Sequence, residues 1–285
     1  MENRNAGARL APAAVFALMI AACSVGPADM HTLRESRPIG SAKEFDVHLK
    51  YDVGRLEIAK IPGGELFSFD LDYDRRRFEP KFNFDGAGDR ASLRLDMDKI
   101  SDLGFGDEEN HLTLRLTERI PIDLDVSAGV SESQLDLSDL KIRRLRLHGG
   151  VGKTEVAFNR AVAEPVKEIE VDSGVGELTI RGLGNAQVER FDLAGGVGSA
   201  ELDFTGEAAA MRNETNIKVG VGEIRLLVPR DANVEIHGES GFLSNIDAPS
   251  FERNGQTYVH RGGNDELKIF IRVESGVGQV SVNLK

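Results

Sequence analysis

The sequence predicts an all-β solenoid, and three observations support this expectation. A short phrase centred on Gly-Val-Gly recurs along the chain, most clearly over residues 171–180 as VDSGVGELTI. Apolar and polar residues alternate on both sides of each copy, which is typical of strands with one buried face. The copies recur about every 22 residues, too few for a strand–helix–strand unit and too many for a tight hairpin. We therefore expect one copy per coil, with each coil stacked on its neighbours.

The centre of each copy predicts a corner in the chain. Seven copies are recognisable, two of them loose, and their central valines are Val53, Val130, Val151, Val175, Val197, Val221 and Val277. The residues four before and five after each valine are apolar, and the alternation shifts by one position in between. On this pattern the valine itself is expected to face inward. A strand whose inward face shifts must bend or bulge, so each copy predicts two short strands meeting at a corner.

Glycine provides the backbone freedom and close approach that such a corner needs. The coil length suits roughly three short strands per turn, and an antiparallel sandwich with regular turns is the competing architecture. The glycines expected at corners are Gly54, Gly129, Gly150, Gly152, Gly174, Gly176, Gly196, Gly198, Gly220, Gly222, Gly276 and Gly278.

Residues 1–22 predict a signal for export, and Cys23 a lipid anchor. Two arginines precede a 13-residue apolar run, which is too short to span a bilayer. The run ends Ile-Ala-Ala-Cys, which resembles a bacterial lipobox. The resemblance implies cleavage before Cys23 and several acyl chains on it, enough for stable anchoring. Ser24 in place of Asp implies sorting to the outer membrane, facing the periplasm. An ordinary signal with a stray cysteine is the alternative.

The rest of the chain divides by pattern. Residues 23–42 are polar, contain Gly and Pro, and predict a flexible tether behind the lipidated cysteine. Residues 43–121 alternate less regularly and predict an N-terminal β region, while 122–285 carry the glycine-cornered coils. Asn254-Gly255 predicts a hairpin protruding near 251–260, which delays the last coil.

Composition excludes several classes of function. The formal charge of −12, without a long basic run, argues against nucleic acid or an anionic lipid surface as partner. A single cysteine excludes a disulfide framework and a cysteine-rich metal site. The six histidines lack metal-ligand spacing. We expect no metal and no cofactor.

Several segments resemble chemical motifs but lack an essential part. Residues 149–154, GGVGKT, resemble a phosphate-binding loop, but the required first glycine is Leu147 and a strand pattern follows. The glycine phrases lack the aspartates of calcium-binding β-rolls. The acidic segment Asp107–Glu109 is interpreted as a solvated loop, with a loosely held cation as the alternative. Nothing singles out a catalytic pair among acids expected to point outward, so we expect no enzyme; these acids are Glu170, Asp172, Glu201 and Asp203.

At the level of phrases the chain resembles a known family. Residues 47–58, 122–129 and the Gly-Val-Gly coils resemble the bacterial toast-rack domain. Residues 227–241 and 273–278 are similar to the C-terminal region of LiaF-type cell-wall-active antibiotic response proteins. The resemblance implies a single-stranded right-handed β-helix, no known catalysis and a role at the envelope. In LiaF-type proteins such a domain follows transmembrane helices and restrains a stress-sensing kinase, whereas here a lipid anchor stands in their place.

Together these observations predict a non-enzymatic, lipid-anchored envelope protein with a binding or scaffold role, which the resemblance places in the envelope stress response. Its partner is expected to be an envelope protein or a wall polymer, bound along a solenoid flank or at the last strand, where free main-chain groups would accept another strand. The alternatives are a carbohydrate-active enzyme on the same scaffold and an adhesin-like protein that self-associates through the solenoid ends.

Overall fold

The computed structural model describes residues 28–100, 110–207 and 210–285, and every regular element in them is a strand. No helix in this part of the chain has the length and apolar character needed to cross a membrane. The strands are β1 (Met30–Pro38), β2 (Glu44–Lys60), β3 (Glu65–Asp74), β4 (Phe78–Asp85), β5 (Arg90–Lys99), β6 (His111–Leu116), β7 (Ile122–Asp136), β8 (Ile142–Ala157), β9 (Glu168–Arg181), β10 (Arg190–Asp203), β11 (Met211–Val228), β12 (Ala232–Asp247), β13 (Glu252–Asn254), β14 (Thr257–Arg261) and β15 (Asn264–Leu284).

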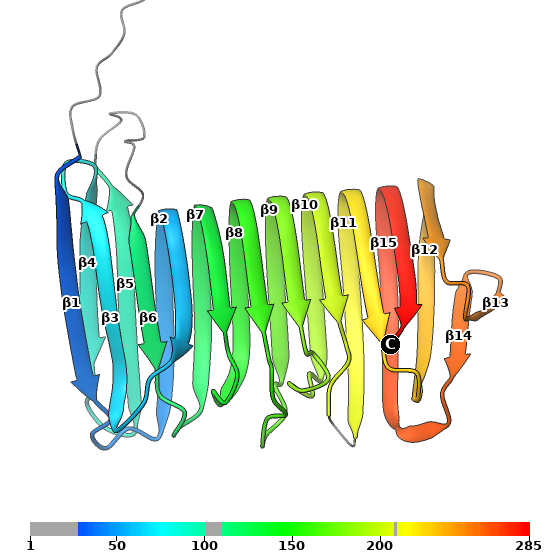
Figure 1. The fold of residues 1–285 in the computed structure, drawn as a ribbon, viewed down its shortest axis with the longest axis horizontal. Coiled ribbons are helices and arrows are strands. Elements are labelled where there is room, and N and C mark those ends of the chain that lie inside the picture. The colour runs from blue at the N-terminus through cyan, green and yellow to red at the C-terminus, as the bar shows by residue number, and fades with distance from the viewer. Residues whose placement is uncertain (1–27, 101–109, 208–209) are drawn as a thin grey trace, which may run out of the picture.

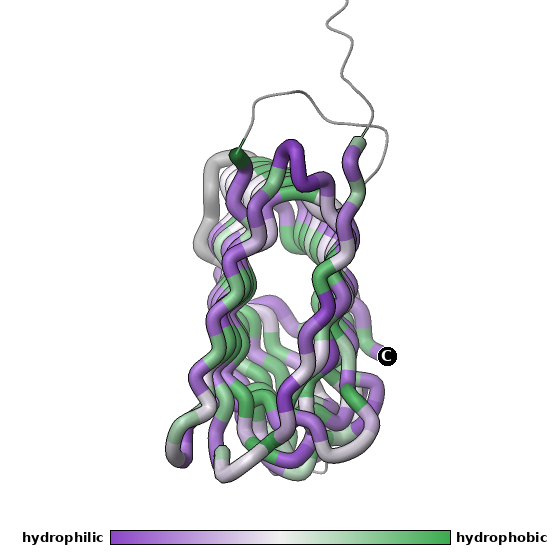
Figure 2. The backbone as a smooth tube through the Cα atoms, turned by 90° about the vertical axis from the view of Figure 1, so that its left-hand side faces the viewer, coloured by the Kyte–Doolittle hydropathy of each residue, from purple (hydrophilic) through white to green (hydrophobic). Residues whose placement is uncertain are grey.

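The body of the molecule is a row of long parallel strands in the order β2-β7-β8-β9-β10-β11-β15-β12 (Figure 1). Viewed along the row, each strand rises in one wall, bends over at the top and descends in the other wall (Figure 2). The parallel pairing confirms the solenoid and excludes the antiparallel sandwich. A coil is one continuous strand with two arms, not three short strands, because the glycine bend carries the strand from one wall to the other within the ladder.

The interior follows the alternation on both sides of the bend. The apolar residues four before and five after each central valine are all buried, as Val171 and Ile180 illustrate in β9. The valines themselves are not: Val175 is half exposed. The expectation that they face inward was wrong, because the shift in alternation is taken up by the glycines and leaves the residue between them on the convex side of the bend.

An antiparallel cap closes the N-terminal end. The first arm of β2 pairs with β5 and the second arm with β6; β4 continues one wall, and β3 followed by β1 continues the other. Phe67 stacks between Phe45 and Phe69 inside this cap. The tether expected over residues 23–42 is therefore a strand from Met30 onward, held on β3 partly by Arg34, whose Nε lies 2.9 Å from an oxygen of Asp70.

The C-terminal end differs from the expected order of coils. β15, although last in the sequence, lies between β11 and β12 and pairs with both. β12 has a register shift between Ser240 and Leu243 where other strands have their glycine bend. The hairpin turns at Gly255-Gln256, one residue later than expected. It does not protrude, because β14 pairs along the start of β12 and covers that edge.

Candidate binding surfaces

The bends are made of glycine because neighbouring coils approach too closely for a side chain. The second glycine of the phrase has a positive φ throughout, +138° at Gly152 and +154° at Gly222. A Cβ at Gly222 would lie 1.7 Å from the carbonyl oxygen of Gly198 in the preceding coil. The structure places all twelve glycines expected at corners in these bends, each with backbone of a neighbouring segment under 3 Å from its virtual Cβ.

An exposed apolar line runs along the top of the bends. Its members pair in register from strand to strand, so their side chains form a single row along the solenoid axis. They are 44–51% exposed, although single exposed apolar residues rather than rows are normal on protein surfaces. We call this row the valine ridge: Val130, Val151, Val175, Val197, Val221 and Val277.

A buried polar cluster lies at the N-terminal end of the ridge. Asp74 and Arg77 form an ion pair, both almost fully buried, and Arg77 Nε has no hydrogen-bond partner among the described residues. Asn110 Oδ1 accepts a hydrogen bond from the Asp74 amide at 3.1 Å, and its Nδ2 donates one to the Val53 carbonyl at 3.0 Å. A hollow of about 860 Å³ runs from this cluster along one flank of the ridge, past Phe78.

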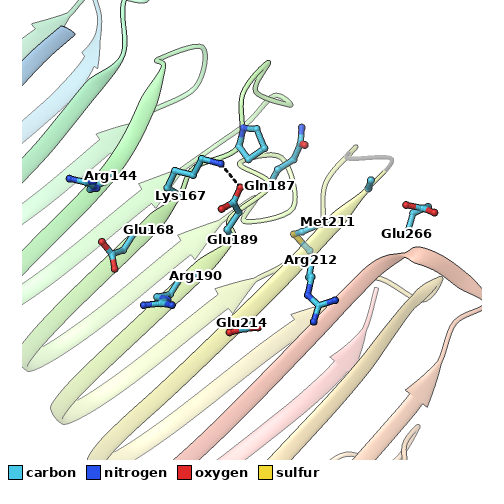
Figure 3. A pocket seen from close by; sticks show the side chains of 12 residues that line it. Arg144, Lys167, Glu168, Gln187, Glu189, Arg190, Met211, Arg212, Glu214 and Glu266 are labelled. Atoms are coloured by element: carbon cyan, nitrogen blue, oxygen red, sulfur yellow. Dashed lines mark hydrogen bonds and ion pairs between the residues drawn. The ribbon is translucent and has the colours of Figure 1, made fainter.

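A second surface lies at the opposite edge, where β8 to β11 begin. A hollow of about 760 Å³ is lined there by charged side chains (Figure 3). One row of residues alternates in sign from strand to strand, and its members pair in register. We call this row the charge ladder: Arg144, Glu168, Arg190 and Glu214.

The last three members of the charge ladder form no ion pair with any described residue. Beside it, Lys167 Nζ lies 2.6 Å from Glu189 Oε1 (Figure 3), whereas Arg212 and Glu266 in the same hollow also form no ion pair with a described residue. Glu168, Arg190 and Glu214 therefore present alternating charges that remain available to a partner.

Several other cross-strand polar groups on the same wall are paired. Arg143 donates two hydrogen bonds to Asp123, at 2.8 and 2.6 Å. Burial pushes the pKa of Asp123 upward, but the Arg143 hydrogen bonds and nearby positive charge outweigh it and hold the pKa below its ordinary value. His148 Nδ1 lies 2.9 Å from Asp172 Oδ2. These pairs support the wall and leave little charge for recognition.

The acids considered for catalysis do not form a paired site. Glu170 and Asp172 lie on the first arm of β9, whereas Glu201 and Asp203 lie on the second arm of β10, in the other wall. Asp203 was expected to point outward but is buried. Its carboxylate accepts a hydrogen bond from Lys285 Nζ at 3.0 Å and two more from Thr205.

The remaining expected sites are also located. Residues 149–154 run through the β8 bend as continuous strand, so they form no phosphate-binding loop ahead of a helix. Within the described ranges, no three His, Cys, Asp or Glu side chains are grouped so that they could hold a metal ion. Cys23, the signal over 1–22 and the acidic segment Asp107–Glu109 lie outside the described residues.

The last strand does not provide the free edge that the sequence led us to expect, because β15 is paired on both sides. The outer strands are β1 and β4 at one end; at the other end β13 is outermost in one wall, and the second arm of β12 is the edge of the other wall. β1 carries Arg34, Arg37 and Pro38, β4 carries Pro80 and Lys81, and β13 has three residues. Charges, proline and short length all discourage edge-to-edge pairing at β1, β4 and β13, whereas the second arm of β12, residues 243–247, has no strand on its outer side among the described residues.

The charge ladder was not predicted from the sequence, although the sequence contains a pattern that indicates it. Its members stand seven residues before the central valines of successive copies, as Arg144 does before Val151 and Glu168 before Val175. Aligning the copies on their valines shows the sign alternating at this single position. The preceding copy continues the series with Asp123.

Fold and surfaces together define a β-solenoid protein with two walls, an apolar ridge on one edge and alternating charge near the other. The chain belongs to the toast-rack family, since the model for the N-terminal domain of toast_rack (DUF2154) matches residues 27–181, more than half of it. This confirms the resemblance to the toast-rack domain. No curated protein sequence matches the chain.

One solved structure shares the fold at low sequence identity, and others are similar to a lower degree. A "putative cell adhesion protein" from Clostridium sporogenes ATCC 15579 is 20% identical with a TM-score of 0.51, over 90% of this chain and 100% of that one. A "putative adhesin" from Bacteroides fragilis NCTC 9343 is 11% identical with a TM-score of 0.39, over 89% and 97%. A "putative lipid binding protein" from Parabacteroides distasonis ATCC 8503 is 10% identical with a TM-score of 0.39, over 90% and 98%.

Proposed function

We propose that the protein is a non-enzymatic, lipid-anchored scaffold of the cell envelope, held at the outer membrane and facing the periplasm, which binds an envelope protein through the charge ladder. The observation that carries the proposal is the row of alternating charges around Arg190 on a parallel sheet, in which Glu168, Arg190 and Glu214 form no ion pair with a described residue. The toast-rack fold and the lipobox-like end at Cys23 support it.

The ladder suits a protein partner because its charges are fixed in order and spacing. Neighbouring strands lie about 4.8 Å apart, so Glu168, Arg190 and Glu214 present signs at regular intervals along the wall. Alternating charges give little net attraction but strong discrimination, since a partner in the wrong register meets like charges. The resemblance to LiaF-type proteins directs the search for the partner to envelope stress sensors.

The test is photocrosslinking in a diderm bacterium from Ala210, which is exposed and lines the same hollow. Ser199, exposed on the other wall, is the control position. We expect a defined envelope protein to be captured from Ala210 and not from Ser199. Adding Arg190→Glu reverses one charge and is expected to lower capture about tenfold, the effect of roughly 1.4 kcal/mol, whereas Arg190→Lys preserves most of it.

Two results would contradict the proposal. Equal capture of the same protein from Ala210 and Ser199 would show that the ladder does not select the partner. Capture of wall glycan alone, insensitive to Arg190→Glu, would replace the protein partner with a polymer. If the captured partner depends on the charge ladder, the proposed scaffold function holds, whether or not that partner takes part in stress signalling.

A further inference from the structure

The place where the chain enters the fold is fixed beside the valine ridge. The Asp29 amide donates a hydrogen bond to Asp74 Oδ1 at 3.1 Å, and Asp29 Oδ2 accepts one from Arg75 Nε at 2.7 Å. Asp74 is linked through Asn110 to the carbonyl of Val53, which aligns with the first valine of the ridge. The entry point therefore lies at the bend edge of the molecule, at one end of the ridge (Figure 1).

The chain between the lipid and this entry point is short. Six residue steps separate Cys23 from Asp29, and an extended chain covers about 20 Å in that length. The tether over residues 23–42 would have reached about 65 Å. Strand β1 removes that freedom, because it holds residues from Met30 onward against β3. An anchored protein would thus keep the entry end of its bend edge within about 20 Å of the lipid surface.

The fold itself does not require valine at the apex of the bends. The glycines on either side meet backbone of the next coil, but the apex side chain is about half exposed. Threonine has the same shape and a comparable preference for strands, and it would present a hydroxyl to water. Valine is nevertheless present in every ridge copy, even where Ser131 replaces the second glycine. The apolar side chains therefore indicate contact with something apolar.

We propose that the valine ridge is a membrane-contact edge, which rests on the lipid surface into which Cys23 is anchored. The inference rests on the proposed lipid anchor. The ridge spans five strand spacings, about 24 Å, in a straight row on a convex edge (Figure 2). The hollow beside the ridge reaches only its first three valines, whereas a planar bilayer surface contacts the whole row at once.

The apolar contact is weak by itself, and the anchor makes it effective. A chain of net charge −12 is not drawn to a membrane by its charge. A lipid on Cys23 holds the ridge at high local concentration near the surface, so that a small apolar gain suffices to keep it there. The solenoid then lies with its axis along the membrane, and the charge ladder at the opposite edge faces away from it, toward a partner.

The experiment measures the depth of a single spin label in the lipidated protein on vesicles of phosphatidylethanolamine and phosphatidylcholine. Because Cys23 is the only cysteine and its sulfur carries the lipid, Val197→Cys introduces a single free thiol. When the protein is bound to vesicles, we expect the accessibility of the nitroxide at position 197 to a water-soluble relaxation reagent to fall at least about threefold, as at a lipid interface. The matched label, Ala210→Cys at the opposite edge, is expected to stay accessible.

Flotation of the vesicles separates the two proposals. Protein that floats with the vesicles while the Val197→Cys label stays as accessible as the Ala210→Cys label would overturn the membrane-contact edge and leave the anchor standing. Protein that does not float would refute the anchor and the ridge contact together. Adding Val151→Asp and Val175→Asp to the Val197→Cys chain is expected to abolish the protection without releasing the protein, and protection that survives both would also contradict the proposal.

Discussion

A single methyl group at the bend of β8 is expected to destabilise the protein severely. Gly152 has φ +138°, and its virtual Cβ lies 2.0 Å from the Ser131 carbonyl oxygen in the preceding coil. A non-glycine residue in such a conformation costs about 1–3 kcal/mol, and displacing packed neighbours costs about 1–3 kcal/mol more. Gly152→Ala should therefore lower the free energy of unfolding by about 2–6 kcal/mol, against a typical total of about 5–15 kcal/mol.

The same strand provides the control. Gly149 lies three residues earlier, has no positive φ, and its virtual Cβ meets nothing nearer than the Asp172 carbonyl oxygen at 3.8 Å. Gly149→Ala is expected to be neutral or to stabilise by about 0.4–1 kcal/mol through the unfolded state.

Urea denaturation followed by circular dichroism, on a soluble form without residues 1–23, measures both variants. Calorimetry shows whether the coils unfold together, which a single free energy requires. Equal midpoints for Gly152→Ala and Gly149→Ala would refute the close approach of the coils, since that contact is what distinguishes the two positions.

Three further predictions follow from single contacts. Arg77→Met leaves the buried carboxylate of Asp74 without its ion-pair partner and should lower the free energy of unfolding by about 3–5 kcal/mol. Arg34→Met breaks an exposed pair and should lower it by about 0–1 kcal/mol. Urea denaturation measures both, and similar losses would contradict the burial of the Asp74–Arg77 pair. Because Arg143 lowers the pKa of Asp123 against the effect of burial, this carboxylate stabilises the fold fully above its unfolded pKa of about 3.9, and the stability is lost as pH falls through the lower folded pKa. Asp123→Asn should therefore flatten the stability curve below about pH 4, and an unchanged slope would argue against the pair. Tyr258→Ala removes a buried ring from β14, which should cost about 3 kcal/mol and uncover the edge of β12; light scattering should then detect association, and a monomer of unchanged stability would show that the hairpin does not protect that edge.

Much of the fold could be predicted because the repeat carries its own constraints. Residues such as Val171 and Ile180 stand at fixed distances from each Gly-Val-Gly, so burial, bending and stacking all follow from one phrase. The direction of the apex valine could not be obtained from the alternation alone. Whether the residue between two glycines lies inside or outside a bend depends on their φ values, which a hydrophobic pattern does not encode.

The order of coils at the C-terminal end could not be predicted from the local sequence pattern either. The chain visits β12 first and then inserts β15 between β11 and β12. The complete phrase around Val277 pairs well with two neighbours, whereas β12, with its irregular bend, pairs in full on one side only. The choice is thus one of competing pairings between distant segments. The strand at Met30–Pro38 was missed for a related reason, because its stability comes from β3 rather than from its own sequence.

The candidate surfaces were predictable to unequal degrees. The glycine positions follow from the phrase, and the charge ladder would have emerged from aligning the copies at Arg144, Glu168, Arg190 and Glu214. The short path from Cys23 to the ridge could not be predicted, because it depends on the hydrogen bond between Asp29 and Asp74, which are 45 residues apart in the sequence. This contact links the position of the proposed anchor to the position of the valine ridge.

The mass of the N-terminal peptide, measured on protein extracted from the membranes of a diderm bacterium that expresses the full chain, tests the central claim most directly. A lipid-anchored scaffold predicts a chain that begins at Cys23 and carries a diacylglyceryl thioether and an acylated amino group, with Cys23→Ala left unprocessed. A chain cleaved elsewhere, or one with a free Cys23 thiol in the membrane-free fraction, would contradict the anchor and with it the orientation of the ridge.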